Sequence, residues 1–166
     1  MSRQNSRLLA TCATAIATLA LAGTAQAVDL RDWGRKLAPA ERFAVLSQFN
    51  NQAVLDKETQ LVWAKNGSTA NTYVTAYFTC MLSDIGGRRG WRLPTAPEIA
   101  SLMATGATSM PSVFAIPTAS YWTTSEHPQN HQYNYQFAVT IHAPDGLLTV
   151  LPRTENRPFV CVRGAT

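Results

Sequence analysis

The sequence predicts an α+β domain in which two helices pack on short antiparallel sheets. Apolar residues recur at three- and four-residue spacing in residues 71–84 and 95–104, which is typical of helices with one buried face. Apolar and polar residues alternate from 133 to 141, which is typical of a half-buried strand. Helices in the middle of the chain and strands at its end place it in the α+β class.

We expect residues 1–27 to be a secretory signal peptide. They contain a positive start at Arg3 and Arg7, an apolar segment at 8–21 and a small-x-small cleavage site at 25–27. A membrane anchor is the alternative, but this apolar segment is roughly 14 residues long and a spanning helix needs about 20. The protein is therefore expected to be exported, either to the periplasm or outside the cell.

The composition of the exported part excludes some classes of function. Removing 27 of 166 residues leaves 139, the length of one domain. Lys plus Arg falls from 14 to 12 while Asp plus Glu stays at 10, so the net charge falls from +4 to +2. Such a balance lacks the basic surface expected of a nucleic-acid-binding protein. A second long apolar run is absent, so we expect no transmembrane helix.

Two cysteines remain in the exported part, Cys80 and Cys161, and an even pair in an exported protein predicts a disulfide. The third, Cys12, raises the possibility of a lipoprotein, but Thr11 is a poor residue before a lipidated cysteine. A metal or thiol-redox site is disfavoured because the pair lies far apart in sequence and lacks CxxC spacing.

Residues 28–50 are expected to form a helical extension ahead of a domain at 51–166. Pro39 opens the expected helix, whose apolar face contains Phe43, Leu46 and Phe49. The extension would pack on the domain or on a partner.

The domain is expected to begin with a hairpin of two strands, 53–55 and 61–64, followed by a loop at 66–68. The helix at 71–84 comes next. Its inward face is expected to contain Tyr73, Ala76, Tyr77 and Cys80.

The stretch from Gly90 to Glu98 is the clearest local signature. It predicts a turn, a buried aromatic residue, an extended Leu-Pro step and a helix start. Thr95 can cap the helix while Glu98, three residues on, bonds back to the cap amide. With two other tryptophans, this stretch gives the expected fold-signature residues: Trp63, Trp91, Arg92, Leu93, Pro94, Thr95, Glu98 and Trp122.

The rest of the chain is expected to be a long loop followed by strands. The second helix ends near 104, with Ile99, Leu102 and Met103 inward. Residues 105–120 lack clear periodicity, and a long loop in a compact domain is often functional. The expected strands are 121–126, 133–141, 147–151 and 157–163, with a turn at 144–146.

Five separated motifs together resemble one bacterial family. They are Val54-Leu55-Asp56 with Leu61-Val62-Trp63, the helix from Ala76 to Cys80, Gly90 to Thr95, Tyr121-Trp122-Thr123-Thr124, and Phe159 to Arg163. This set is similar to the C-terminal domain family of the collagen-like adhesin Lcl, over residues 51–164. The resemblance implies a C-type-lectin-like fold, a Cys80–Cys161 disulfide and, for the best-known member, adhesion to sulfated glycosaminoglycans. That member has a collagen-like repeat, which this chain lacks.

Catalytic signatures are weak. His127 and His131 flank one loop without a third ligand, which favours two solvated histidines over a metal site. The chain has neither a GxSxG nucleophile motif nor a glycine-rich phosphate loop. Formylglycine-generating oxidases have a related fold and a catalytic cysteine pair. Here the only pair is assigned to a structural disulfide, so we expect no enzyme activity.

No cofactor is expected, and calcium is disfavoured. Residues 126–130, Glu-His-Pro-Gln-Asn, supply oxygen ligands but neither of the triplets used by calcium-dependent lectins. Calcium takes six to eight oxygens, and Glu126 is the only carboxylate between Glu98 and Asp145.

Basic residues indicate an anion site. Arg88, Arg89 and Arg92 lie close together in sequence, and the arginine fork suits sulfate and carboxylate groups. Arg92 is expected to pair with Glu98, and Arg163 to end a core strand. The predicted ligand-binding residues are Arg88, Arg89, Lys65, Gln129, Asn130 and Tyr133.

Two functions therefore stay open beside the disfavoured oxidase. The first is a non-catalytic binding module for a glycan or another anionic ligand at the cell surface or in the periplasm. The second is a structural subunit that binds protein partners in an envelope assembly. The sequence leaves the oligomeric state undetermined.

Overall fold

The computed structural model describes residues 37–103, 109–126, 136–142 and 145–165. Residues 1–27, the expected signal peptide, and residues 28–36 of the expected extension lie outside these ranges. The elements in chain order are α1 (Pro39–Arg42), β1 (Phe43–Val45), the 3-10 turn η1 (Ser47–Phe49), β2 (Ala53–Asp56), β3 (Leu61–Ala64), β4 (Ser68–Asn71), α2 (Tyr73–Leu82), α3 (Ala96–Leu102), β5 (Ser120–Trp122), β6 (Phe137–His142), β7 (Leu148–Pro152), β8 (Arg157–Phe159) and β9 (Val162–Gly164).

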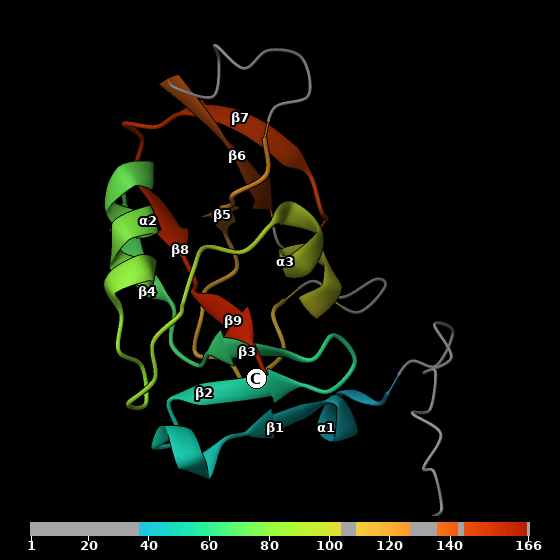
Figure 1. Ribbon diagram of the computed structural model, residues 1–166. Helices are drawn as coiled ribbons and strands as arrows, with labels where there is room; N and C mark the ends of the chain where they lie inside the picture. The colour runs from blue at the N-terminus through green and yellow to red at the C-terminus, as the bar shows by residue number, and fades with distance from the viewer. Residues whose placement is uncertain (1–36, 104–108, 127–135, 143–144, 166) are drawn as a thin grey trace, which may run out of the picture. The chain divides into compact units, whose positions relative to one another are not determined.

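The described strands form three small antiparallel sheets (Figure 1). The first has the order β1-β2-β3-β9, the second pairs β4 with β8, and the third has the order β5-β6-β7. Strands β8 and β9 follow one another in the chain but belong to different sheets, so the short segment between them joins the two sheets. The α+β class and the disulfide are confirmed.

The predicted helix over residues 39–49 is wrong for most of its length. Only Pro39–Arg42 is α-helical and Ser47–Phe49 forms a 3-10 turn, whereas Phe43–Val45 is a strand that pairs with β2, in the register Phe43↔Asp56. Strand β2 offers the backbone partners that a short isolated helix cannot provide for itself. Asn50 and Asn51 then take positive φ angles, which turns the chain back into β2.

The helices predicted at 71–84 and 95–104 are confirmed with shorter bounds. Thr72 caps α2 by accepting a hydrogen bond from the Thr75 amide, 3.4 Å away. At α3, Thr95 and Glu98 form the predicted capping box. Of the residues predicted to face inward from α2, Ala76 and Cys80 are buried, whereas Tyr77 is exposed.

Several predicted strands have different bounds. Strand β4 replaces the end of the predicted loop and the start of the predicted helix, because it pairs with β8. The strand predicted at 157–163 is split at Val160 and Cys161, and the one at 121–126 ends at Trp122. Residues 138–141 of β6 are all buried, so this part of the strand is covered on both faces, not one. Residues 133–135 lie outside the described part.

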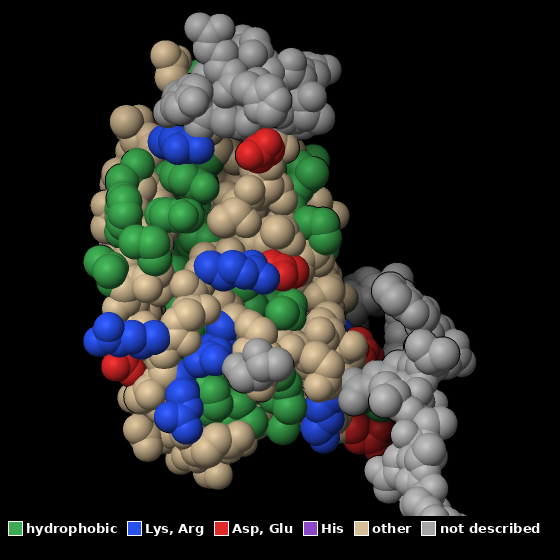
Figure 2. Space-filling view, in the orientation of Figure 1, with side chains coloured by type: hydrophobic (Ala, Val, Ile, Leu, Met, Phe, Trp, Pro, Cys, Tyr) green, Lys and Arg blue, Asp and Glu red, His purple; other side chains and the backbone are tan. Residues whose placement is uncertain are grey.

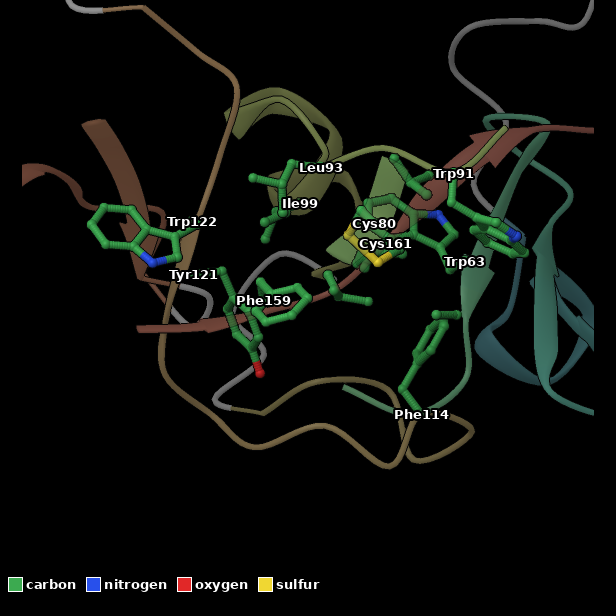
Figure 3. Close-up of a cluster of buried hydrophobic side chains, with 14 of the residues drawn as sticks. Trp63, Cys80, Trp91, Leu93, Ile99, Phe114, Tyr121, Trp122, Phe159 and Cys161 are labelled. Atoms are coloured by element: carbon green, nitrogen blue, oxygen red, sulfur yellow. A yellow bond between two sulfur atoms is a disulfide. The ribbon is translucent and has the colours of Figure 1, made fainter. Parts of the chain in front are cut away.

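The core surrounds the disulfide (Figure 3). Cys80 of α2 and Cys161 of the β8–β9 link are joined at an S–S distance of 2.04 Å, and their exposed fractions are 0% and 5%. The three signature tryptophans, Trp63, Trp91 and Trp122, are buried as predicted. The described core residues with the largest fully buried side chains also include Tyr121, Phe159, Leu93, Ile99 and Leu102.

A buried ion pair joins α1 to the β2–β3 hairpin. The Arg42 guanidinium donates two hydrogen bonds to the Asp56 carboxylate, at 2.6 and 2.8 Å, and one to the Ser101 carbonyl at 2.6 Å. Burial alone would raise the pKa of Asp56, but the bonds from Arg42 and from the Thr59 hydroxyl hold that pKa below its usual 3.8.

Removing the disulfide should strongly destabilise the fold. The bond closes a loop with a sequence separation of 81, which the chain-entropy model equates with about 4 kcal/mol of stability. We expect the double variant Cys80→Ala plus Cys161→Ala to lose about this much free energy of unfolding in urea titrations monitored by tryptophan fluorescence. A loss below about 1 kcal/mol would show that packing alone holds α2 on the core.

Asp56→Ala should cost about 3 kcal/mol at pH 7, because it leaves the buried Arg42 guanidinium without its main partner. Since the folded pKa of Asp56 is lowered, the unfolded chain takes up the proton first as the pH falls. The stability that Asp56 contributes is therefore complete above about pH 5. It is lost as the pH falls through the pKa of Asp56 in the folded state, below about 4. Comparing the free energies of unfolding of the wild type and of Asp56→Ala across this pH range measures the contribution.

The matched control is Asp84→Ala, which breaks an ion pair between exposed side chains, Asp84 and Arg89, 3.7 Å apart. This variant should unfold almost as the wild type does. Equal destabilisation by the two substitutions would contradict the assignment of Asp56 as a buried structural charge.

Candidate functional site

The loop that follows α2 carries the two arginines predicted to bind an anion. Gly86 has a φ of +63° and packs so closely on the Phe49 backbone that a Cβ would overlap it. The Gly86 amide donates to the Gln52 side chain at 2.8 Å, and the Trp91 indole N–H donates to the Arg88 carbonyl at 2.6 Å. Hydrogen bonds to Gln52 and from the buried Trp91 therefore hold both ends of the loop in place.

Arg88 and Arg89 meet Arg163 of β9 at this loop, and we name these three residues the arginine cluster. Arg163 donates from Nη1 to the Arg89 carbonyl at 2.7 Å. The guanidinium carbons of Arg88 and Arg163 each lie 5.9 Å from the centre of the Phe49 ring. Figure 2 shows basic side chains gathered over β9 and the loop that follows α2.

The charge of Arg89 is only weakly compensated by its acidic neighbour. Arg89 is 83% exposed, and its Nε lies 3.7 Å from the Asp84 carboxylate, which is itself half exposed. Such a solvated pair contributes little, so it competes weakly with an incoming anion. Phe49 provides an apolar surface beneath two of the guanidinium groups. The cluster can therefore present planar arginine forks to sulfate or carboxylate groups.

Arg92 lies outside this cluster, as the sequence predicted. Its guanidinium donates to both oxygens of Glu98, at 2.6 and 2.8 Å, and Glu98 also accepts from the Thr95 amide at 2.7 Å. Burial would raise the pKa of Glu98, but Arg92 and the Thr95 amide hold it below its usual value. Arg92, whose backbone pairs with Val162, thus joins the capping box to β9.

Lys65 lies one strand away from the cluster. Its amide donates to the Gln52 carbonyl at 2.9 Å, and the Gln52 side chain in turn bonds Gly86. These two contacts place the Lys65 backbone near the loop, but they do not bring its ammonium group onto the arginines.

The other predicted ligand residues, Gln129, Asn130 and Tyr133, lie outside the described residues, as do His127 and His131. An open depression of about 550 Å³ is lined by Thr72, Val74, Gln136, Phe137, Pro152, Arg153 and Thr154. Arg153 is held there by a bond to the Phe137 carbonyl at 3.1 Å and by the Tyr73 ring, 4.3 Å from its guanidinium carbon. The calcium and cofactor expectations stay predictions.

Two members of the site were missed by sequence reasoning. Arg163 is 74 residues from Arg89 and was assigned to the end of a core strand, so no local pattern could connect them. Phe49 was assigned to the apolar face of a helix that does not form. Arg163 ends the Phe159–Arg163 motif, but only the pairing of β9 with Arg92, four residues after Arg88, brings it to this loop.

Comparison with protein families finds that the Lcl C-terminal domain matches residues 52–163. The match begins at the β2–β3 hairpin and ends at Arg163, so it contains all three arginines of the cluster. No curated protein matches the chain. Within the described ranges, none of the helices has the length and apolar character needed to cross a bilayer.

Comparing Glu98→Gln with Glu98→Ala should separate the stability contributed by the Arg92–Glu98 ion pair from that contributed by the helix cap. Glutamine keeps an oxygen for the Thr95 amide but loses the charge that faces Arg92, so we expect a loss of about 0.5–1 kcal/mol in the free energy of unfolding. Glu98→Ala loses both interactions and should cost about 1 kcal/mol more. Urea unfolding of both variants at pH 7 measures the difference. Equal costs would mean that the capping box contributes no stability.

Proposed function

Because the chain belongs to the Lcl C-terminal domain family, we propose that it is an exported, non-catalytic module that binds anionic glycans, such as sulfated glycosaminoglycans, through the arginine cluster. The supporting observation is the meeting of Arg88 and Arg89 with Arg163, from distant parts of the sequence, on a loop held at both ends by hydrogen bonds. The arginines are pre-positioned, so an incoming ligand has little backbone left to order.

The chemistry of the cluster favours sulfate and carboxylate groups over neutral sugars. Guanidinium groups bond such anions through paired N–H donors, and each charge-assisted bond is stronger than a neutral one. The net charge of the exported part is only about +2, so the attraction is local and should weaken as salt screens it. Linear polyanions with regularly spaced sulfates match several arginines on one face better than a single small anion does.

A non-catalytic role is supported by the state of the cysteines. Cys80 and Cys161 are joined to each other and almost fully buried, so neither presents a thiol for oxidase chemistry of the formylglycine-generating type.

We further propose that the fold is C-type-lectin-like. The two longer helices, the short antiparallel sheets and a disulfide from the first of these helices to the segment before the last strand agree with that architecture. The fold alone does not fix a ligand, and the glycan proposal rests on the arginines.

Binding of the purified exported protein to heparin, measured by titration calorimetry over a salt series, tests the proposed function. We expect calcium-independent binding that weakens with salt, and a rise of at least about tenfold in Kd for Arg88→Ala plus Arg89→Ala. Asp84→Asn should tighten binding, because it removes the carboxylate beside Arg89.

Two controls separate geometry from charge. Lys57→Ala removes a positive charge from the β2–β3 turn, on the other side of the molecule in Figure 1, and should change Kd far less than Arg89→Ala. Arg88→Lys plus Arg89→Lys keeps the charge but loses the fork, and should weaken binding partially. No binding at low salt, or equal losses for Lys57 and Arg89 variants, would overturn the proposal.

A further inference from the structure

Helix α2 turns a regular apolar face toward solvent. Val74, Tyr77, Phe78, Met81 and Leu82 follow the spacing i, i+3, i+4, i+7, i+8, and their exposed fractions run from 40% to 73%. We name these five residues the α2 stripe. Figure 2 shows apolar side chains gathered over α2 at the left of the view. A helix with this spacing normally packs its apolar face against another element. Among the described residues, no element covers the α2 stripe.

The α2 stripe cannot turn inward to bury itself. The opposite face of the helix is occupied by Ala76 and by Cys80, whose disulfide fixes the helix to the core. A series of aromatic contacts also supports the stripe from the core side. Trp122 packs on Tyr73, Tyr73 on Tyr77, and Tyr77 on Phe78, with ring centroids 5.5 to 6.4 Å apart. The stripe is therefore a rigid surface with large apolar anchors, as in well-packed protein interfaces.

Opposite charges lie at the two ends of this surface. Helix α2 has no charged side chain in its ten residues. At its first turn, the Arg153 guanidinium lies over the Tyr73 ring, 4.3 Å from the ring centre. Beyond its last turn, the Asp84 carboxylate lies 3.7 Å from Arg89. A basic group at one end and an acidic group at the other suit an antiparallel copy of the same helix.

We propose that the α2 stripe is the interface of a two-fold homodimer, in which the α2 helices of two copies pack antiparallel. A two-fold axis near Phe78 places Val74 of one copy opposite Leu82 of its partner, since both are four residues from Phe78. It brings Arg153 toward Asp84 of the partner subunit. The antiparallel arrangement also sets the two helix dipoles in opposite directions, which is favourable.

The size of the stripe predicts a weak dimer. Stable complexes bury about 800 Å² on each partner, and five partly exposed side chains supply roughly half of that. Only the residues that flank the ends of α2 add further buried area. We therefore expect a dissociation constant of about 10–100 µM, with monomer dominant in dilute solution.

Sedimentation equilibrium of the purified exported protein, from about 1 to 500 µM, tests the proposal. The wild type should show a monomer–dimer equilibrium, and Phe78→Glu should raise the dissociation constant at least about tenfold, because it places two carboxylates at the two-fold axis. The matched control is Thr79→Glu, which adds the same charge to an exposed position of α2 outside the stripe and should dimerise as the wild type does. Circular dichroism checks that both variants stay folded.

Cross-linking tests the orientation. With a short bis-maleimide, Phe78→Cys alone should cross-link efficiently, and Val74→Cys should cross-link to Leu82→Cys in a mixture better than either does alone. Wild type serves as the background control. A monomer at every concentration, or a dimer that Phe78→Glu leaves intact, would overturn the proposal. If the monomer instead binds anionic or neutral lipid vesicles through Phe78, the stripe is a membrane-contact surface and the dimer is excluded.

Discussion

The disulfide between Cys80 and Cys161 is the constraint on which the rest of the structure depends, because it fixes a segment shared by several parts of the fold. Phe159, just before this segment, pairs with Ser68 of β4, and the Cys161 carbonyl accepts from the Ala64 amide. Val162 pairs with Trp63 on one side and exchanges two backbone bonds with Arg92 on the other. One covalent bond thus ties α2 to two sheets and to the Trp91–Pro94 stretch.

Both proposed surfaces depend on this arrangement. The arginine cluster forms because β9 brings Arg163 beside the loop after α2, and the stripe stays exposed because Cys80 holds the opposite face of α2 on the core. The two surfaces also fit together functionally. A dimer carries two arginine clusters, and two linked weak sites can bind a long polyanion more tightly than one. Such pairing would supply avidity to a single module.

The sequence was informative where local chemistry decides structure. The capping box of Thr95 and Glu98, the hairpin before Ala64 and the pairing of the two cysteines follow from short patterns, and each is found in the structure. The pairing of Arg92 with Glu98 was likewise predictable from a helix start three residues away from the arginine.

Local patterns failed where a distant partner decides the outcome. Residues 43–45 have helix-like spacing but become a strand because β2 lies beside them, and the polar strand β4 forms only because β8 is available. Helix α2 is apolar on both faces, so its periodicity placed Cys80 correctly in the core but also placed Tyr77 there, although Tyr77 is exposed. Arg163 was absent from the predicted site for the same reason, because only the pairing of β9 brings it to Arg89.

Nuclear magnetic resonance with a sulfated heparin oligosaccharide tests the central claim most directly, because it reports the contact surface residue by residue in the ¹⁵N-labelled protein. The account predicts that the largest amide shift changes fall in residues 86–90 and 163–164, and that they shrink as salt is added. Shift changes centred on the α2 stripe or on β7, with the 86–90 loop unmoved, would contradict the assignment of the arginine cluster as the glycan site.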